Sequence, residues 1–442
     1  MDEVSSWGKY PKVKGELKTV RTKEEAVEKV LQLNHWIPRG LARSYGDSSL
    51  AAEMLLGVAL NRFISFDVQE GILTCEAGVS FTEIIDVFVP RGWFLPVTPG
   101  TKFITVGGAI ASDVHGKNHH LEGSFSRHLI SFELLIPSGE ILFCSREQNF
   151  DVFNATTGGM GLTGFILQAT FRLKKIETAY ISQESSIAKN LDDVFKQFEA
   201  GMKSTYSVAW IDCMTGGKNT GRSILLKGEH ARLAELKEPG ARQHPLQIAN
   251  KVKFNIPFEF PDFALNALTF RTMNFLYYNK EPNSVKNSIK AFDPYFYPLD
   301  SINNWSRAYG KRGFTQYQLV LPPDKSFDGL LQILAKIHSA KMGTFVTVLK
   351  YFGKQPEGLI SFPMEGYTLA LDFPVSDSLF PFLNQLDEIV LKAGGRLYLS
   401  KDSRMSPEMF RAGYPGLSAF LEVKNRLDPS GKIQSAQSKR LL

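Results

Sequence analysis

The sequence predicts a mixed α and β protein of two or three lobes, and three observations support this fold class. At 442 residues the chain exceeds what one ordinary hydrophobic core accommodates. Hydrophobic residues make up 43% and charged residues 22%, which argues against disordered, collagen-like and coiled-coil chains. Strand and helix signals alternate up to about residue 180, the pattern changes there, and a strand followed by a helix returns from residue 396.

In the first lobe, short polar motifs mark where helices begin. Thr22 and Glu25 have the spacing of a capping box and precede apolar residues at helical intervals, and Ser80 and Glu83 repeat this arrangement. Apolar or alternating runs between turn residues mark the strands. The expected elements, in order, are a helix from Thr22, strands 63–66 and 72–76, a helix 80–89, a hairpin of strands 129–136 and 140–144, and a strand 165–173.

Beyond residue 180 the sequence predicts a second unit and then a return. We expect a helix at 191–202, a strand at 206–213 and a long irregular region rich in aromatic residues. Near the C-terminus, Ser406 can cap a helix whose first position is Pro407, and Asp428-Pro429 ends the run. A domain boundary is therefore expected near residue 180.

Two segments of mostly small residues, 38–47 and 98–116, are predicted to be binding loops rather than ordinary surface turns. Such loops present backbone N–H groups without side-chain obstruction, so a pyrophosphate would fit between them. The motif at 159–164 has the form G-x-G-x-x-G but leads into a strand instead of a helix. That context argues against a Rossmann dinucleotide site and favours a tight turn.

Charge and potential metal ligands limit the classes of function. Lysine and arginine exceed aspartate and glutamate by six, 51 against 45, and the excess is spread along the chain. This pattern disfavours nucleic-acid binding and suits an anionic small substrate or an acidic membrane surface. Three separated cysteines predict neither a disulfide framework nor a zinc site. His115, His119 and His120 are interpreted as pocket or loop histidines, because Gly116 and Asn118 disfavour a metal-binding helix.

Residues 254–278 contain eight aromatic side chains interleaved with Lys251, Lys253 and Arg271. The segment could lie at a membrane interface, cover an apolar ligand or form an aromatic core, and its poor periodicity leaves these alternatives open. The first fifteen residues show no secretory signal, and no run approaches the ~18 apolar residues that span a bilayer. We expect a cytoplasmic protein able to contact the inner membrane peripherally.

Four sequence blocks together resemble a known family. They are GLARSYGD at 40–47, TPGTKFITVGGAIASDVHGKNHH at 98–120, TTGGMGLTG at 156–164 and YLSKDSR at 398–404. These blocks are similar to the decaprenylphosphoryl-β-D-ribose 2'-oxidases, the flavin subunits of an epimerase that makes the arabinose donor of cell envelopes. The resemblance covers nearly the whole chain, and HGKNHH is its most specific block.

The resemblance implies an α+β fold of the vanillyl-alcohol oxidase type. An FAD-binding domain would comprise residues 1–180, a sheet-based substrate domain residues 181–395, and a C-terminal segment, 396–442, would return to the FAD-binding domain. Some relatives in the wider superfamily attach the flavin to a histidine in the first loop, where this chain has Tyr45. We therefore expect non-covalent FAD.

The resemblance also implies site residues. Lys401 would supply positive charge beside the flavin, and Tyr45 and His115 are alternatives for orienting or deprotonating a sugar hydroxyl. Substrate-binding positions would be Gln316, Gln318, Lys350, which could meet a phosphate, and Thr368. The residues implied to hold FAD are Arg43, Ser44, Tyr45, Gly46, Asp47, Thr101, Gly107, Gly108, Ser112, His115, Gly116, Gly159, Gly161, Gly164 and Lys401.

One departure from the family pattern lies in the strand 367–373. Some members carry a cysteine and an asparagine where this chain has Ala370 and Thr368. A thiol would then not be needed for turnover, and inhibition directed at a thiol would not carry over.

Oxidation of the 2'-hydroxyl of a polyprenyl-phosphoryl ribose to the 2'-keto sugar is the leading hypothesis. The family implies a quinone or oxygen as electron acceptor and a short-chain NAD(P)H-dependent reductase as the partner that completes epimerisation. An FAD enzyme acting on a soluble sugar or aldonolactone is one alternative. A non-catalytic binder of lipid-linked sugars or a membrane-surface scaffold is the other.

Overall fold

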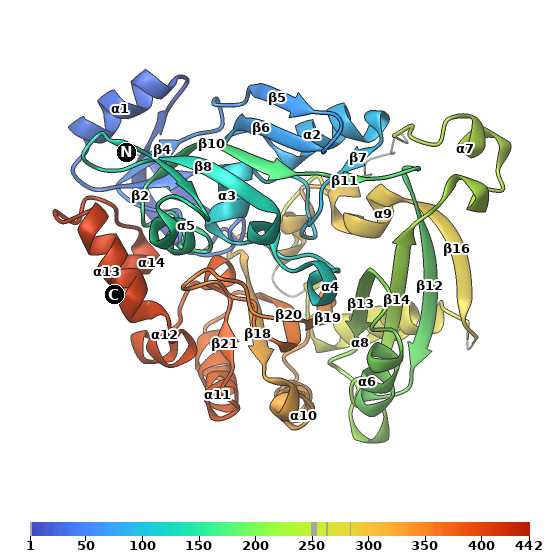
Figure 1. The fold of residues 1–442 in the computed structure, drawn as a ribbon. Helices are drawn as coiled ribbons and strands as arrows, with labels where there is room; N and C mark the ends of the chain where they lie inside the picture. The colour runs from blue at the N-terminus through green and yellow to red at the C-terminus, as the bar shows by residue number, and fades with distance from the viewer. Residues whose placement is uncertain (1, 249–253, 262–263, 283) are drawn as a thin grey trace.

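Three larger β-sheets organise the chain in a computed structural model that describes residues 2–248, 254–261, 264–282 and 284–442. Two of these sheets come from the first lobe, and one eight-stranded sheet comes from the middle of the chain (Figure 1). The predicted mixed α and β class is confirmed. No helix in the described ranges is both long and apolar enough to cross a membrane.

The first lobe contains a four-stranded sheet of order β1-β2-β4-β3 and a five-stranded antiparallel sheet of order β5-β6-β10-β8-β9. The strands are β1 (Asp2–Ser5), β2 (Lys12–Thr19), β3 (Trp36–Arg39), β4 (Glu53–Leu56), β5 (Phe63–Asp67), β6 (Ile72–Glu76), β8 (Leu129–Leu135), β9 (Ile141–Ser145) and β10 (Phe165–Arg172), with β7 (Trp93–Phe94) pairing β11 (Lys174–Lys175) outside them. The helices are α1 (Lys23–Gln32), α2 (Phe81–Phe88), α3 (Val106–Ala111), α4 (His119–Glu122) and α5 (Phe150–Thr156).

The capping residues and the hairpin turn predicted in this lobe are present in the structure. Thr22 caps α1 by accepting the Glu25 N–H, and Ser80 and Glu83 form a full capping box at the start of α2. The hairpin expected around Pro137-Ser138-Gly139 is β8 and β9. These helix starts and this hairpin are therefore confirmed.

The stretch 98–116 was expected to be a loop, and that expectation is wrong for one part of it. Helix α3 lies inside it, capped by Thr105, whose hydroxyl accepts the Gly108 N–H at 3.1 Å. The helix has only six residues, two of them glycine, so the sequence shows no helical periodicity of apolar residues there. The run expected at 406–428 is likewise divided into α12 (Pro407–Gly413) and α13 (Leu417–Leu427) by Tyr414-Pro415-Gly416.

The middle of the chain forms an antiparallel sheet of order β16-β12-β14-β13-β19-β20-β18-β21. Its strands are β12 (Tyr180–Ala188), β13 (Tyr206–Ile211), β14 (Ser223–His230), β16 (Lys286–Ala291), β18 (Phe314–Leu321), β19 (Thr347–Phe352), β20 (Gly366–Pro374) and β21 (Arg396–Leu397), and a separate pair joins β15 (Phe254–Asn255) to β17 (Ile302–Asn303). Its helices are α6 (Leu191–Ala200), α7 (Pro239–Gln243), α8 (Ala267–Asn279), α9 (Phe292–Phe296), α10 (Pro323–Ala340) and α11 (Leu379–Lys392). Helices α6, α10 and α11 pack on this sheet (Figure 1).

After β21 the chain runs back to the first lobe. The Trp36 N–H of β3 donates to the Lys432 carbonyl at 2.9 Å, and the Ala436 N–H donates to the Leu50 carbonyl at 2.7 Å. The last helix is α14 (Ala436–Leu441), and Figure 1 shows α13 and α14 beside the blue strands of the four-stranded sheet. The division into 1–180, 181–395 and 396–442 stays a prediction.

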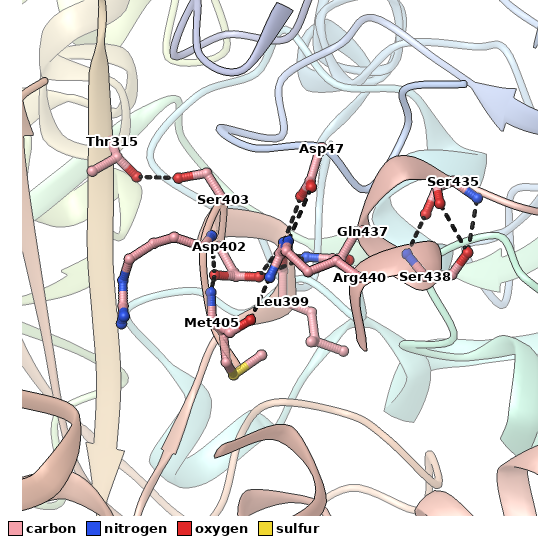
Figure 2. A network of polar contacts seen from close by, with 11 residues as sticks. Asp47, Thr315, Leu399, Asp402, Ser403, Met405, Ser435, Gln437, Ser438 and Arg440 are labelled. Atoms are coloured by element: carbon pink, nitrogen blue, oxygen red, sulfur yellow. Dashed lines mark hydrogen bonds and ion pairs between the residues drawn. The ribbon is translucent and has the colours of Figure 1, made fainter. Parts of the chain in front are cut away.

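Arg440 of α14 joins two loops that approach from different parts of the chain (Figure 2). Its Nη2 atom lies 2.8 Å from Oδ1 of Asp47 and 2.9 Å from Oδ2 of Asp402. Both carboxylates are buried, at 4% and 7% exposure, and they share this one guanidinium as their cation. Asp47 follows Tyr45 and Asp402 follows Lys401, so the contact fixes the loops that carry both residues.

We predict that Arg440→Met lowers the free energy of unfolding by about 3 kcal/mol, because it leaves two buried carboxylates without their cation. Urea denaturation of the purified holoprotein measures the change. Lys439→Met alters the exposed neighbouring residue and serves as the control. Equal stability of the two variants would contradict the proposed importance of this contact.

Candidate active site

A cavity of about 970 Å³ is lined both by loops of the first lobe and by strands of the eight-stranded sheet. The segments 38–45 and 98–117 contribute to one part of its wall, and β13, β18, β19 and β20 contribute to another. Its volume is near the upper end of the range for small-molecule sites, roughly 300–1,000 Å³. The cavity therefore has room for a large cofactor together with part of a substrate.

The first-lobe wall is built from small residues in constrained conformations. A Cβ atom added at Gly100 would meet no atom within 4 Å, so this glycine faces open space. Ala42 and Met160 both line the cavity with left-handed backbone, at φ +56° and +53°, which costs an L-residue about 1–2 kcal/mol. The Ser49 hydroxyl is buried there without a partner in the described ranges. A cradle of this kind fits a bound pyrophosphate.

Arg43 lies where the two predicted binding loops meet. Its Nε atom donates to the Phe103 carbonyl at 3.2 Å, and its guanidinium stacks 4.1 Å from the centre of the Trp7 ring. Burial lowers the Arg43 pKa, whereas the charge of Asp300 opposes that shift. An arginine stays protonated near neutral pH, so Arg43 supplies a fixed cation beside the cradle.

His115 lies on the substrate side of the cavity between two polar side chains. The Gln318 amide nitrogen is 3.2 Å from Nε2, and the Lys350 amine is 3.3 Å from Nδ1. Burial and the charge of Lys350 lower the His115 pKa well below its ordinary value, so the imidazole is neutral. Both ring nitrogens of His115 therefore have a polar partner.

Three partly buried lysines surround this part of the cavity. Burial and the charges of Lys350 and Lys290 lower the Lys117 pKa to about 7. The Lys350 pKa is also lowered to about 7, by burial and by the charge of Lys401. Burial lowers the Lys401 pKa as well. An anionic ligand placed among these amines would favour their protonated forms, so the cavity is suited to a negatively charged substrate.

Lys401 lies opposite a carboxylate that sequence reasoning missed. Its Nζ atom is 4.0 Å from the centre of the Tyr45 ring, and the charge of Asp372 opposes the lowering of its pKa. Asp372 on β20 is fully buried, accepts a hydrogen bond from Gln316, and keeps its second oxygen without a partner in the described ranges. An aspartate within the otherwise apolar strand YTLALDFP was the signal that could have revealed it.

The comparisons with known proteins agree with this geometry. Residues 19–145, which include both predicted binding loops, match the family described as an FAD binding domain. The chain is 37% identical over 413 residues to the decaprenylphosphoryl-beta-D-ribose oxidase of Mycolicibacterium smegmatis, covering 92% of this chain and 88% of that protein. The chain belongs to this family of FAD-dependent oxidases.

Two further relatives cover most of the chain. An uncharacterized protein in the mprA 5' region of Streptomyces coelicolor is 33% identical over 82% of this chain and 100% of its own length. The L-gulonolactone oxidase of Mus musculus is 22% identical over 84% of this chain and 81% of its own length. The protein is thus an FAD-binding enzyme of an oxidase family that acts on alcohol or sugar substrates, and the scaffold hypothesis has no support.

Most of the residues that the family resemblance assigned to the site line the cavity, but four of them do not. A Cβ atom at Gly46 would lie 1.6 Å from the Asp402 carbonyl oxygen, and one at Gly159 would lie 2.1 Å from that of Ala155. These glycines permit close packing behind the wall. Asp47 pairs with Arg440, and the Thr368 hydroxyl lies 3.3 Å from the Gln318 amide, so these two support residues of the site.

We predict that the Lys350→Met variant loses part of the dependence of stability on pH. The Lys350 pKa is about 7 in the folded state and about 10.4 in an unfolded chain, so the unfolded state binds more protons between these values. The free energy of unfolding therefore rises with pH in this window, by up to about 1.4 kcal/mol per pH unit for this group.

Urea denaturation of the holoenzyme near the two ends of the window measures this slope. Lys336→Met, on the exposed surface of α10, is the matched control and should keep the wild-type slope. An unchanged slope in the Lys350 variant would contradict the assignment.

Proposed function

We propose that the enzyme oxidises the 2'-hydroxyl of a polyprenyl-phosphoryl-β-D-ribose to the 2'-keto sugar, the first half of epimerisation to an arabinose donor for cell-envelope synthesis. The observation that carries the proposal is His115, which lies among partly buried lysines, with Lys350 3.3 Å from Nδ1, in the cavity that also contains the cofactor cradle. The similarity to the decaprenylphosphoryl-beta-D-ribose oxidase of Mycolicibacterium smegmatis supports this substrate.

We infer that Arg43, Ser44, Thr101, Gly107 and Gly108 hold the FAD pyrophosphate, since all five line the cradle. FAD, when bound, supplies the acceptor for the hydride of the sugar carbinol. Tyr45 stands where a covalent histidine link would be made in other members of the superfamily. Burial raises the Tyr45 pKa, so its phenol stays protonated, and we propose that FAD is bound without a covalent bond.

The protein groups have distinct roles in this proposal. His115 takes the hydroxyl proton, since an anionic substrate bound among the lysines would raise its lowered pKa, whereas the Tyr45 phenol orients the hydroxyl. Gln316 and Gln318 position the sugar, and Lys350 contacts the phosphate after taking up a proton. Lys401 supplies positive charge that stabilises the reduced cofactor.

The remaining participants are proposed on the family resemblance. Electrons would leave through a quinone or oxygen, and a short-chain NAD(P)H-dependent reductase would complete epimerisation. The alternative substrate is a soluble sugar or aldonolactone, which the L-gulonolactone oxidase relative favours at 22% identity. The three partly buried lysines favour the phosphorylated substrate, because a neutral lactone would bring no negative charge to pair with them.

Anaerobic mixing of the holoenzyme with each alcohol tests the proposal. Polyprenyl-phosphoryl ribose should remove the absorbance of oxidised flavin within one turnover, and L-gulonolactone should not. Rapid loss of absorbance with the lactone alone would establish the alternative. The arabinose epimer, whose 2'-hydroxyl points the other way, is the stereochemical control.

We predict that Lys401→Ala slows flavin reduction by roughly 10²–10³-fold, because it removes a preorganised charge from the reacting region. Stopped-flow absorbance at saturating substrate measures the rate constant, and bound FAD is quantified first. Lys354→Ala, at an exposed position after β19, should behave as wild type. A near-normal rate for the Lys401 variant would remove that lysine from its proposed role.

A further inference from the structure

Large apolar side chains are exposed in the segment between residues 254 and 285, where the sequence left three interpretations open. The structure buries Phe270, at 3% exposure, and leaves other side chains of the segment in solvent. Lys251, Lys253 and Phe263 lie outside the described residues. We define the apolar face as the side chains with 56–74% exposure, namely Phe254, Phe258, Leu268, Phe275, Leu276 and Val285.

Helix α8 is fixed to the sheet by its other side. The Asn274 amide donates to Oδ1 of the buried Asp212 at 2.8 Å, and Tyr277 packs 4.8 Å from the Trp210 ring. Leu268, Phe275 and Leu276 are spaced by seven and eight residues, so they form one outward stripe. An anchored helix normally presents polar residues outward, so an apolar outward stripe indicates a binding surface.

The apolar face lies beside the opening of the cavity. Tyr277 of α8 and Lys280, the residue that follows the helix, line the cavity, so this helix forms part of its wall. Strand β17 contributes both of its residues to another part of the wall. It pairs with β15, the strand that carries Phe254. Exposed wall residues, namely Lys280, Lys290, Asn303 and Asn304, mark where the cavity meets solvent.

Positive charge accompanies the apolar side chains. Four exposed cations lie on α8, next to it or on the neighbouring edge strand: Arg271, Lys280, Lys286 and Lys290. Among nearby acids, Glu259 pairs with Lys9 at 2.7 Å, and Glu281 accepts a hydrogen bond from Ser185 at 3.1 Å. Apolar side chains rimmed by lysine and arginine match a bilayer that contains anionic lipids.

We propose that the apolar face docks on an anionic lipid bilayer and turns the cavity opening toward it. A second copy of the chain fits less well, because a symmetric contact would bring the same four cations together and cover the opening. Docking would let a lipid-linked sugar phosphate reach His115 while its chain stays among lipids. That role rests on the proposed function, whereas the docking itself does not.

Vesicle sedimentation of the holoenzyme tests the docking surface. The triple variant Leu268→Ser, Phe275→Ser, Leu276→Ser should bind vesicles of phosphatidylcholine and phosphatidylglycerol about tenfold or more weakly, because it removes three side chains that enter the interface. The matched control is Leu31→Ser, Ile64→Ser, Phe143→Ser, three exposed apolar positions of the first lobe. It should bind as wild type, and flavin absorbance confirms that both variants are folded.

Three results would overturn the proposal. One is equal vesicle binding by the triple variant and its control. Another is wild-type binding to vesicles of phosphatidylcholine alone that equals binding to vesicles with phosphatidylglycerol, which would show that anionic lipid plays no part in docking. The third is a wild-type dimer that only the triple variant converts to a monomer, which would assign the face to a second copy. Loss of vesicle binding in the variant, together with no oxidation of the ribose lipid by wild type, would support docking and reject the proposed function.

Discussion

The bridge from Arg440 to Asp47 and Asp402 is the constraint on which the site depends. One guanidinium from the last helix bridges two buried carboxylates that lie 355 positions apart in the chain. Each carboxylate ends a short segment that carries a site residue, Tyr45 in one and Lys401 in the other. The Tyr45 N–H also donates to the Ser400 carbonyl at 2.9 Å, so the segments are joined by backbone as well as by charge.

Burial of the titratable side chains gives the cavity wall its chemical character. Burial keeps the Tyr45 phenol protonated and His115 neutral, and it draws the lysine pKa values toward neutrality. The lowered lysine pKa values reduce the stability of the ligand-free protein, because the charged amines lose part of their hydration without gaining a carboxylate or phosphate partner. A phosphate would relieve part of that cost, so substrate binding and charge state are coupled at this site.

Local sequence was enough to predict many elements but not their long-range partners. The capping box at Ser80 and the hairpin at 129–144 depend on neighbours within a few residues, and both appear as predicted. Arg440 could not be assigned from sequence, because its partners Asp47 and Asp402 lie far along the chain, whereas Asp372 was signalled only by a carboxylate within a largely apolar strand. Likewise, α3 is short and glycine-rich, and its cap at Thr105 matters more than periodicity.

The cavity wall contains Ala370, and no cysteine lines the cavity in the described part of the chain. Cys75, Cys144 and Cys213 are all buried, and burial raises the thiol pKa of each, to about 12 for Cys144 and about 11 for Cys213. The thiolate is the reactive form of cysteine, so these three cysteines should react slowly with alkylating reagents in the native enzyme. A cysteine placed at position 370 would therefore be a selective attachment point for a spectroscopic label inside the cavity.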